Sequence, residues 1–294
     1  MNFSLQILAN PVVVGMYALL IGSFLSVCIF RIPYGRPKGL ESLEIDDDVA
    51  DKIQKESKDK INIFFPKRSF CPVCKNQLLW WHNIPLFSWI LLRGKCHYCK
   101  AKIPFRYPLV ELLSLVFALL SYYNFSGATA IIVYIVCCSL IVISFIDIDY
   151  YIIPNLITFP GMIIGFLLAV TNQYFEVFTY PLAPTIVSSL LGLALGGGFL
   201  FFISEVYFRL RKKVGLGFGD VKLMAMAGLF FGPEIVLQAI FLGSLLGSFL
   251  GIGQIIFSKK GMATPLPFGP YLAMGIVLSL FLSNTFVSSM FKLS

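Results

Sequence analysis

Eight apolar segments follow one another along the chain, and they restrict it to the folds of a membrane protein. A helix needs about 20 apolar residues to cross a bilayer, and most of these segments approach that length. The chain is 57% hydrophobic and only 13% charged, which is unlike a water-soluble domain. We therefore predict an all-α polytopic membrane protein. The predicted spans are Pro11–Phe30, Tyr107–Tyr123, Ala128–Ile146, Leu156–Val170, Thr185–Phe208, Val221–Phe231, Glu234–Phe257 and Phe268–Phe291.

The sixth segment, Val221–Phe231, is short, so the basic residues are used to decide whether it spans the bilayer. Fifteen of the 23 Lys and Arg residues lie between Arg31 and Arg106. This is the positive-inside pattern of a cytoplasmic loop, and it argues against nucleic acid as a partner. With eight spans, Arg209–Lys213 and Lys259–Lys260 also fall on the cytoplasmic side. We therefore predict about eight transmembrane helices, with the N-terminus outside.

This topology divides the chain into three parts. We predict a first transmembrane helix over residues 1–30, a small cytoplasmic domain over 31–106 and a transmembrane domain over 107–294. No Lys or Arg precedes Arg31, so we expect an uncleaved first span in place of a signal peptide. In the loop, residues 41–60 carry acids first and lysines later. They predict either a short amphipathic helix or a solvated insert.

Two C-x-x-C pairs lie in the predicted cytoplasmic domain. Cys71 and Cys74 form the first, Cys96 and Cys99 the second, and 21 residues separate them. Four thiolates at this spacing are typical of a zinc ribbon. Two disulfides are the alternative, which a reducing cytoplasm disfavours. We predict a structural Zn²⁺ site that closes a zinc-ribbon-like domain, since a complete set of four thiolates leaves no open position for catalysis.

Two aspartates lie at the ends of predicted spans. Asp147 closes the third span, and Asp220 opens the sixth after a glycine-rich run that includes Gly217 and Gly219. An ionisable group at membrane depth is a functional-site hypothesis. Two carboxyl groups that meet, one ionised and one protonated, can activate water and polarise a peptide carbonyl. The glycines would let the backbone bend closely and admit an extended substrate strand. Each aspartate could instead merely end or cap its helix.

Three other ionisable residues accompany this pair. Asp149 lies further toward the loop than Asp147, so we expect it to be more exposed. Lys222 is two residues from Asp220, a spacing that does not share a helix face, so we expect no direct ion pair. Glu111, in the second span, is a candidate for a buried pairing partner or a substrate contact.

Taken together, seven motifs in order resemble the type IV prepilin peptidases, the bifunctional leader peptidases and N-methyltransferases of the GxGD aspartic protease group. The resemblance covers almost the whole chain. The motifs are Gly22–Val27 leading to Arg31–Pro33, the two C-x-x-C pairs, Asn83–Trp89, Arg106–Glu111, Ile146–Asp149 with Ile153–Pro154, Gly217–Lys222 and Pro265–Tyr271.

The resemblance implies an aspartic endopeptidase of the bacterial inner membrane that removes the leaders of prepilins and pseudopilins on the cytoplasmic side. The family's catalytic aspartates match Asp147 and Asp220. Gly217, Gly219, Lys222 and Glu111 fall in its motifs as substrate-binding or supporting residues. Many members then methylate the new N-terminus, so the resemblance alone implies S-adenosylmethionine as methyl donor.

Two positions depart from the family pattern. Asn155 stands where Asp is frequent, which leaves Asp147 favoured as the catalytic acid. Ser26 stands where Asn is usual, in a region linked to methylation, so a peptidase without methyltransferase activity stays open. A proton-coupled transporter is a further alternative, but such folds often show two corresponding halves, and no internal repeat is visible here.

Overall fold

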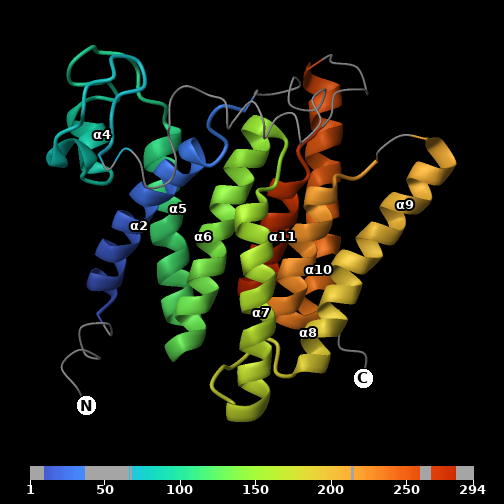
Figure 1. Cartoon of the computed structure of the whole chain (residues 1–294). Helices are drawn as coiled ribbons and strands as arrows, with labels where there is room; N and C mark the ends of the chain where they lie inside the picture. The colour runs from blue at the N-terminus through green and yellow to red at the C-terminus, as the bar shows by residue number, and fades with distance from the viewer. Residues whose placement is uncertain (1–9, 37–65, 67, 213–214, 259–265, 283–294) are drawn as a thin grey trace. The chain divides into compact units, whose positions relative to one another are not determined.

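The computed structural model describes residues 10–36, 66, 68–212, 215–258 and 266–282. The predicted helix or insert at 41–60 lies outside these residues. The described residues form helices and no named strand, apart from two isolated bridges. The helices are α2 (Pro11–Arg31), η2 (Trp80–Asn83), α4 (Phe87–Leu91), α5 (Arg106–Asn124), α6 (Gly127–Tyr150), α7 (Asn155–Phe175), α8 (Ile186–Leu193), the π-helical η3 (Ala194–Gly198), α9 (Phe199–Arg211), α10 (Phe218–Ser258) and α11 (Gly269–Leu282). Figure 1 labels the α-helices among them.

Six helices in the described part of the chain are long and apolar enough to cross a membrane. They are α2, α5, α6, α7, the continuous run Ile186–Arg211 and α10. The first five correspond to the first five predicted spans, and α10 contains the sixth and seventh. The predicted eighth span is described over the 14 residues of α11. The all-α polytopic fold class is therefore confirmed.

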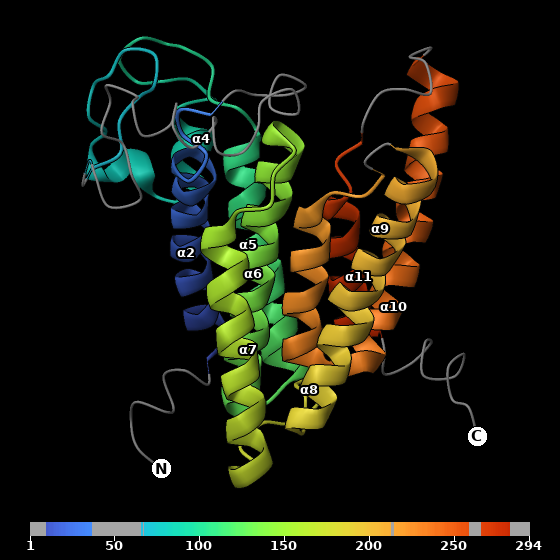
Figure 2. The same cartoon turned by 45° about the vertical axis from the view of Figure 1, so that its right-hand side comes forward.

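Although α10 is continuous in the helix assignment, it turns back on itself at Gly232. This glycine has φ 77° and ψ −172°, and Pro233 follows it. A Cβ placed on Gly196 would meet both the Met224 carbonyl oxygen and Val236 Cγ2. Twelve residues of straight helix would separate Met224 from Val236 by about 18 Å. The two halves of α10 are therefore a hairpin, and Figure 2 shows them as separate orange columns. The predicted break between the sixth and seventh spans is confirmed.

The helices belong to two compact units. The first comprises residues 1–124 and 130–142, and the second comprises 125–129 and 143–294. In the first unit, α2 packs along α5. In the second unit, α10 is the central element and packs against α7, α8, η3 and α11. The limits predicted at 30/31 and 106/107 describe membrane topology and stay a prediction.

α8 and the first half of α10 approach each other closely in the second unit. A Cβ on Gly192 would overlap the carbonyl oxygen of Gly228, and a Cβ on Gly228 would overlap that of Gly192. Small residues at such crossings let two membrane helices approach closely. The two backbones therefore touch without any side chain between them.

This contact predicts that alanine variants at two glycines of neighbouring helical turns differ in stability. Gly192→Ala should lower the melting temperature of the detergent-purified protein, because overpacking costs about 1–3 kcal/mol. Gly198→Ala is the matched control: nothing lies within 4 Å of its added Cβ, and Ala is a better helix former than Gly. Equal melting temperatures for the two variants, measured by thermal unfolding, would contradict the close contact.

Candidate active site and metal centre

Asp147 lies in the last turn of α6 and is 5% exposed. The backbone N–H of Gly269 donates a hydrogen bond of 3.0 Å to its Oδ2. Because α11 begins at Gly269, this N–H belongs to the first turn of a helix, where donors lack partners within the helix. A Cβ on Gly269 would lie 2.8 Å from the same oxygen. Glycine at this position therefore permits the contact that holds the carboxyl group.

Asp220 lies in the first turn of α10 and is 7% exposed. Its backbone N–H donates to the carbonyl oxygen of Gly217 at 3.1 Å. A Cβ on Gly217 would lie 3.3 Å from Asp220 Oδ2, yet Gly217 itself is exposed. The missing side chain thus leaves the approach to this carboxyl group open on the side of Gly217.

The buried side chain of Ile153 brings the two aspartates into one site. A Cβ on Gly219, next to Asp220, would lie 3.0 Å from Ile153 Cβ, and one on Gly269 would lie 3.2 Å from Ile153 Cδ1. Ile153 therefore packs against the backbone beside each aspartate. Asp147 also acts on Asp220 electrostatically. The second unit thus places two buried carboxyl groups, 73 positions apart in the printed sequence, around one isoleucine.

The other predicted residues of this site have different partners. Lys222 Nζ donates a hydrogen bond to Asn155 Oδ1 at the start of α7 and lies 5.3 Å from the ring centre of Phe218. Asn155, the position that departs from the family pattern, is therefore a partner of this lysine. Asp149 is half-buried while Asp147 is buried, so the expected difference in exposure is confirmed.

The four predicted metal ligands form one cluster in the first unit. The sulfur atoms of Cys71, Cys74, Cys96 and Cys99 all lie within 4.8 Å of one another. The Cys71–Cys99 sulfur separation is 3.8 Å, far above a disulfide bond length, and all seven cysteines, each within the described residues, are unpaired. Four Zn–S bonds of about 2.3 Å in a tetrahedron place sulfurs about 3.8 Å apart. The donor set therefore fits Zn²⁺.

Matching backbone turns build the two halves of this cluster. Cys71 N–H donates to Asn76 O at 2.9 Å, and Cys96 N–H donates to Ala101 O at 2.8 Å. Lys75 and Lys100 each take φ 60° at the same place in their turns. Hydrogen bonds, first from the backbone N–H of Cys99 and then from Tyr98 and the neighbouring thiols, lower the pKa of Cys96 to about 7, whereas burial and its neighbouring thiols raise the pKa of Cys99 to about 11. Cys96 therefore forms the metal-binding thiolate more readily than Cys99 does.

Comparison with known proteins is consistent with both sites. Residues 16–125 match the bacterial peptidase A24 N-terminal domain, and residues 134–252 match the type IV leader peptidase family. A protein of Xanthomonas campestris is 35% identical over 95% of this chain and 93% of its own length. The chain belongs to the type IV leader peptidase family.

Other relatives of this leader peptidase family carry the same name. That name, prepilin leader peptidase/N-methyltransferase, is given to the Xanthomonas protein, to a Legionella pneumophila protein with 31% identity over 94% of this chain and 92% of its own length, and to a Pseudomonas aeruginosa protein with 33% identity over 88% and 85%. No solved structure matches the chain. In this family member, Asp147 and Asp220 both lie in the second unit, which includes most of the residues matched to the peptidase family.

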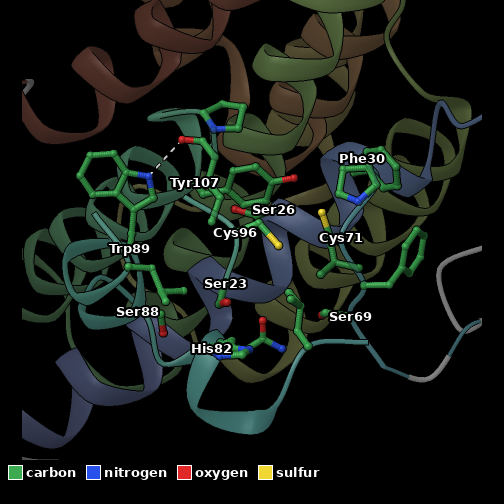
Figure 3. A pocket seen from close by; sticks show the side chains of 18 of the residues that line it. Ser23, Ser26, Phe30, Ser69, Cys71, His82, Ser88, Trp89, Cys96 and Tyr107 are labelled. Atoms are coloured by element: carbon green, nitrogen blue, oxygen red, sulfur yellow. Dashed lines mark hydrogen bonds between the residues drawn. The ribbon is translucent and has the colours of Figure 1, made fainter. Parts of the chain in front are cut away.

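The first unit of this leader peptidase family member holds a pocket of about 190 Å³. It lies among α2, the cysteine-bearing loops and the start of α5, and Figure 3 shows ten of its lining side chains with labels. Glu111, predicted as a substrate or pairing residue, lines this pocket. Its Oε2 accepts a hydrogen bond of 2.8 Å from Leu86 N–H. The structure therefore assigns Glu111 to the first unit, while the aspartates belong to the second.

Sequence reasoning missed His82 as a residue of this pocket. It is not among the clustered ligands of the metal site. It is only 7% exposed, and its Nε2 has no hydrogen-bond partner. The sequence held one signal for His82. It directly precedes the Asn83–Trp89 motif, and the metal site does not account for that motif.

Proposed function

We propose that this protein is a membrane aspartic endopeptidase that removes prepilin and pseudopilin leaders and then N-methylates the new N-terminus, with Asp147 and Asp220 as its catalytic pair. The observation that carries the peptidase assignment is the convergence of these two buried carboxyl groups around Ile153. Membership of the type IV leader peptidase family supports the reaction class. The N-methyltransferase activity is supported by the names of the relatives.

The two carboxyl groups take different roles in peptide hydrolysis. Donation by Gly269 N–H stabilises negative charge on Asp147. We therefore assign Asp147 as the ionised partner, which takes a proton from water while the water oxygen attacks the scissile carbonyl carbon. Asp220, protonated, donates a hydrogen bond to the carbonyl oxygen. Collapse of the tetrahedral intermediate breaks the C–N bond, and a proton passes to the nitrogen of mature pilin.

The surroundings of this pair suit an extended substrate. The exposed Gly217 leaves the side of Asp220 open, and an extended strand could approach there without meeting a side chain. Lys222, fixed by Asn155, supports the start of α10. We assign Gly217 and Gly219 to substrate access and close packing, and Lys222 to support.

The metal and the membrane complete the proposal. We propose Zn²⁺ in the four-cysteine cluster, where it would hold two loops together and leave no open position for catalysis. S-adenosylmethionine would supply the methyl group. We also propose that the chain lies in the bacterial inner membrane with its N-terminus outside. Its aspartates and cysteine cluster would then be cytoplasmic, because most of its Lys and Arg residues lie in the loop between α2 and α5.

Cleavage of a prepilin by the purified, lipid-reconstituted protein tests this function. A single cut between the leader and the mature apolar helix is the expected result. The transporter alternative predicts proton flux through the same liposomes without substrate. Flux without any cleavage, across several prepilins, would replace the peptidase assignment.

The contact between Gly269 and Asp147 makes a further prediction for this assay. Gly269→Ala should lower the cleavage rate about tenfold or more, because its methyl group would displace the carboxyl group from its N–H donor, and one such bond to a charged group contributes about 1.5–3 kcal/mol. Gly251→Ala is the control, since its Cβ would meet only Leu266 Cδ1 at 3.8 Å. Equal cleavage rates for the two variants would contradict the assigned contact.

A further inference from the structure

The pocket of the first unit holds opposite charges and an unused donor. Glu111 and Arg31, both buried, line it together with His82. Its volume of about 190 Å³ would admit on the order of ten water molecules, so a small organic ligand can enter. The remaining wall is largely apolar and includes Phe30, Leu86 and Trp89. Figure 3 shows Phe30 and Trp89 around the same space as His82.

The hydrogen bonds of His82 determine whether its other ring nitrogen, Nε2, is a donor or an acceptor. Nδ1 accepts a hydrogen bond of 3.3 Å from Leu79 N–H, so the proton of the neutral ring belongs on Nε2. Burial, and next the charge of His97, lowers the pKa of His82, which favours this neutral ring. Nε2–H is therefore a buried donor without an acceptor. Burying a donor without an acceptor is unfavourable, so a ligand that supplies an acceptor is favoured.

The carboxyl group of Glu111 defines the other end of the ligand. One of its oxygens accepts from Leu86 N–H, and in its ionised form this buried carboxylate favours a cation beside it. Arg31 offers positive charge in the same pocket. A ligand that fits all three groups carries a cation, an anion and further hydrogen-bond acceptors.

We propose that this pocket binds the methyl donor S-adenosylmethionine, with Glu111 facing its cationic end and His82 Nε2–H donating to one of its acceptor atoms. This inference rests on the proposed N-methyltransferase function. The donor has a sulfonium and an amino-acid group that is both cationic and anionic, which matches Glu111 and Arg31. The assignment makes His82 and Glu111 binding residues for the donor and places its site in a different unit from the aspartates.

The reaction supported at this site is a simple transfer. The neutral amine of the new pilin N-terminus attacks the methyl carbon of the sulfonium, and an N–C bond forms. The C–S bond breaks with its electron pair on sulfur, which leaves a neutral thioether. The amine proton passes to water. Glu111 would favour the charged sulfonium over the thioether product.

Calorimetric titration of the zinc-loaded, detergent-purified protein with S-adenosylmethionine and S-adenosylhomocysteine tests the proposal. Glu111→Gln keeps an acceptor for Leu86 N–H but removes the charge. It should weaken binding of S-adenosylmethionine at least about tenfold, while S-adenosylhomocysteine, without the sulfonium charge, loses less. His82→Leu should weaken both ligands about tenfold. His82→Gln, which can still donate, should restore part of that loss.

Two controls keep this test independent of folding and of the proposed function. Trp80→Leu substitutes an exposed ring of η2, the helix that carries His82, at a position that does not line the pocket, and it should leave both affinities near wild type, with unchanged metal content in all variants. Methylation of a pre-cleaved pilin peptide by wild type tests the proposed function separately. The inference would be overturned if the wild type methylates the peptide while His82→Leu and Glu111→Gln bind the donor as tightly as the wild type does. Binding of the pilin N-terminal peptide at this pocket in place of the donor would also overturn it.

Discussion

Asp147→Asn and Asp220→Asn should each leave prepilin essentially uncut, with cleavage rates reduced by about 10²–10⁴-fold, the usual contribution of a positioned acid or base. Asn keeps the shape of the side chain and its contact with Gly269 N–H or its place above Gly217. It cannot take a proton from water or stand protonated beside a carbonyl. Initial rates with reconstituted protein and a fluorescent prepilin measure the effect.

Asp149→Asn is the matched control for this prediction. Asp149 lies on the same helix, two residues from Asp147, and is half-buried. The variant should cut at close to the wild-type rate. If Asp149→Asn were inactive and Asp147→Asn active, the catalytic assignment would pass to Asp149. Melting temperatures of all three variants separate loss of catalysis from loss of folding.

Removal of the metal should have the second large effect, on the structure of the first unit. Structural Zn²⁺ in small sites contributes on the order of 10–16 kcal/mol to folding. Cys96→Ser removes one of four ligands, so we expect zinc content to fall from about one ion per chain and the loop between α2 and α5 to become sensitive to protease. Atomic absorption and limited proteolysis measure the two results.

Cys28→Ala serves as the control for the metal prediction. Cys28 lies in α2, is buried, and is not among the clustered ligands. Its variant should keep the wild-type metal content and protease resistance. Detection of Cys71–Cys99 or any other disulfide in protein from a reducing cytoplasm, together with absence of zinc, would contradict the metal assignment.

Local sequence patterns predicted the features that depend on neighbouring residues. The apolar segments predicted the membrane helices, because the bilayer sets both their length and their composition. The spacing of the C-x-x-C pairs predicted the sulfur cluster, because a tetrahedral ion restricts where its ligands can lie. The short sixth segment, predicted as a span separate from the seventh, similarly anticipated the turn inside α10.

Contacts between distant segments were beyond these patterns. Gly269 N–H meets Asp147 across 122 positions, and Ile153 joins the backbones beside both aspartates. The free Nε2 of His82 depends on which loops cover it, which no local period records. Asn155 was noted only as a departure from a family pattern, while the structure gives it a partner in Lys222. These features follow from tertiary packing.

The central claim is that this chain cuts and methylates at two independent sites, and one variant tests it most directly. Reconstituted Asp220→Asn protein is given prepilin and, separately, a pre-cleaved pilin peptide with S-adenosylmethionine, and mass spectrometry reads both products. We predict uncut prepilin together with methylation of the pre-cleaved peptide within about twofold of wild type, as for independent sites. Prepilin cut at the wild-type rate, or loss of both activities in a folded variant, would contradict this account.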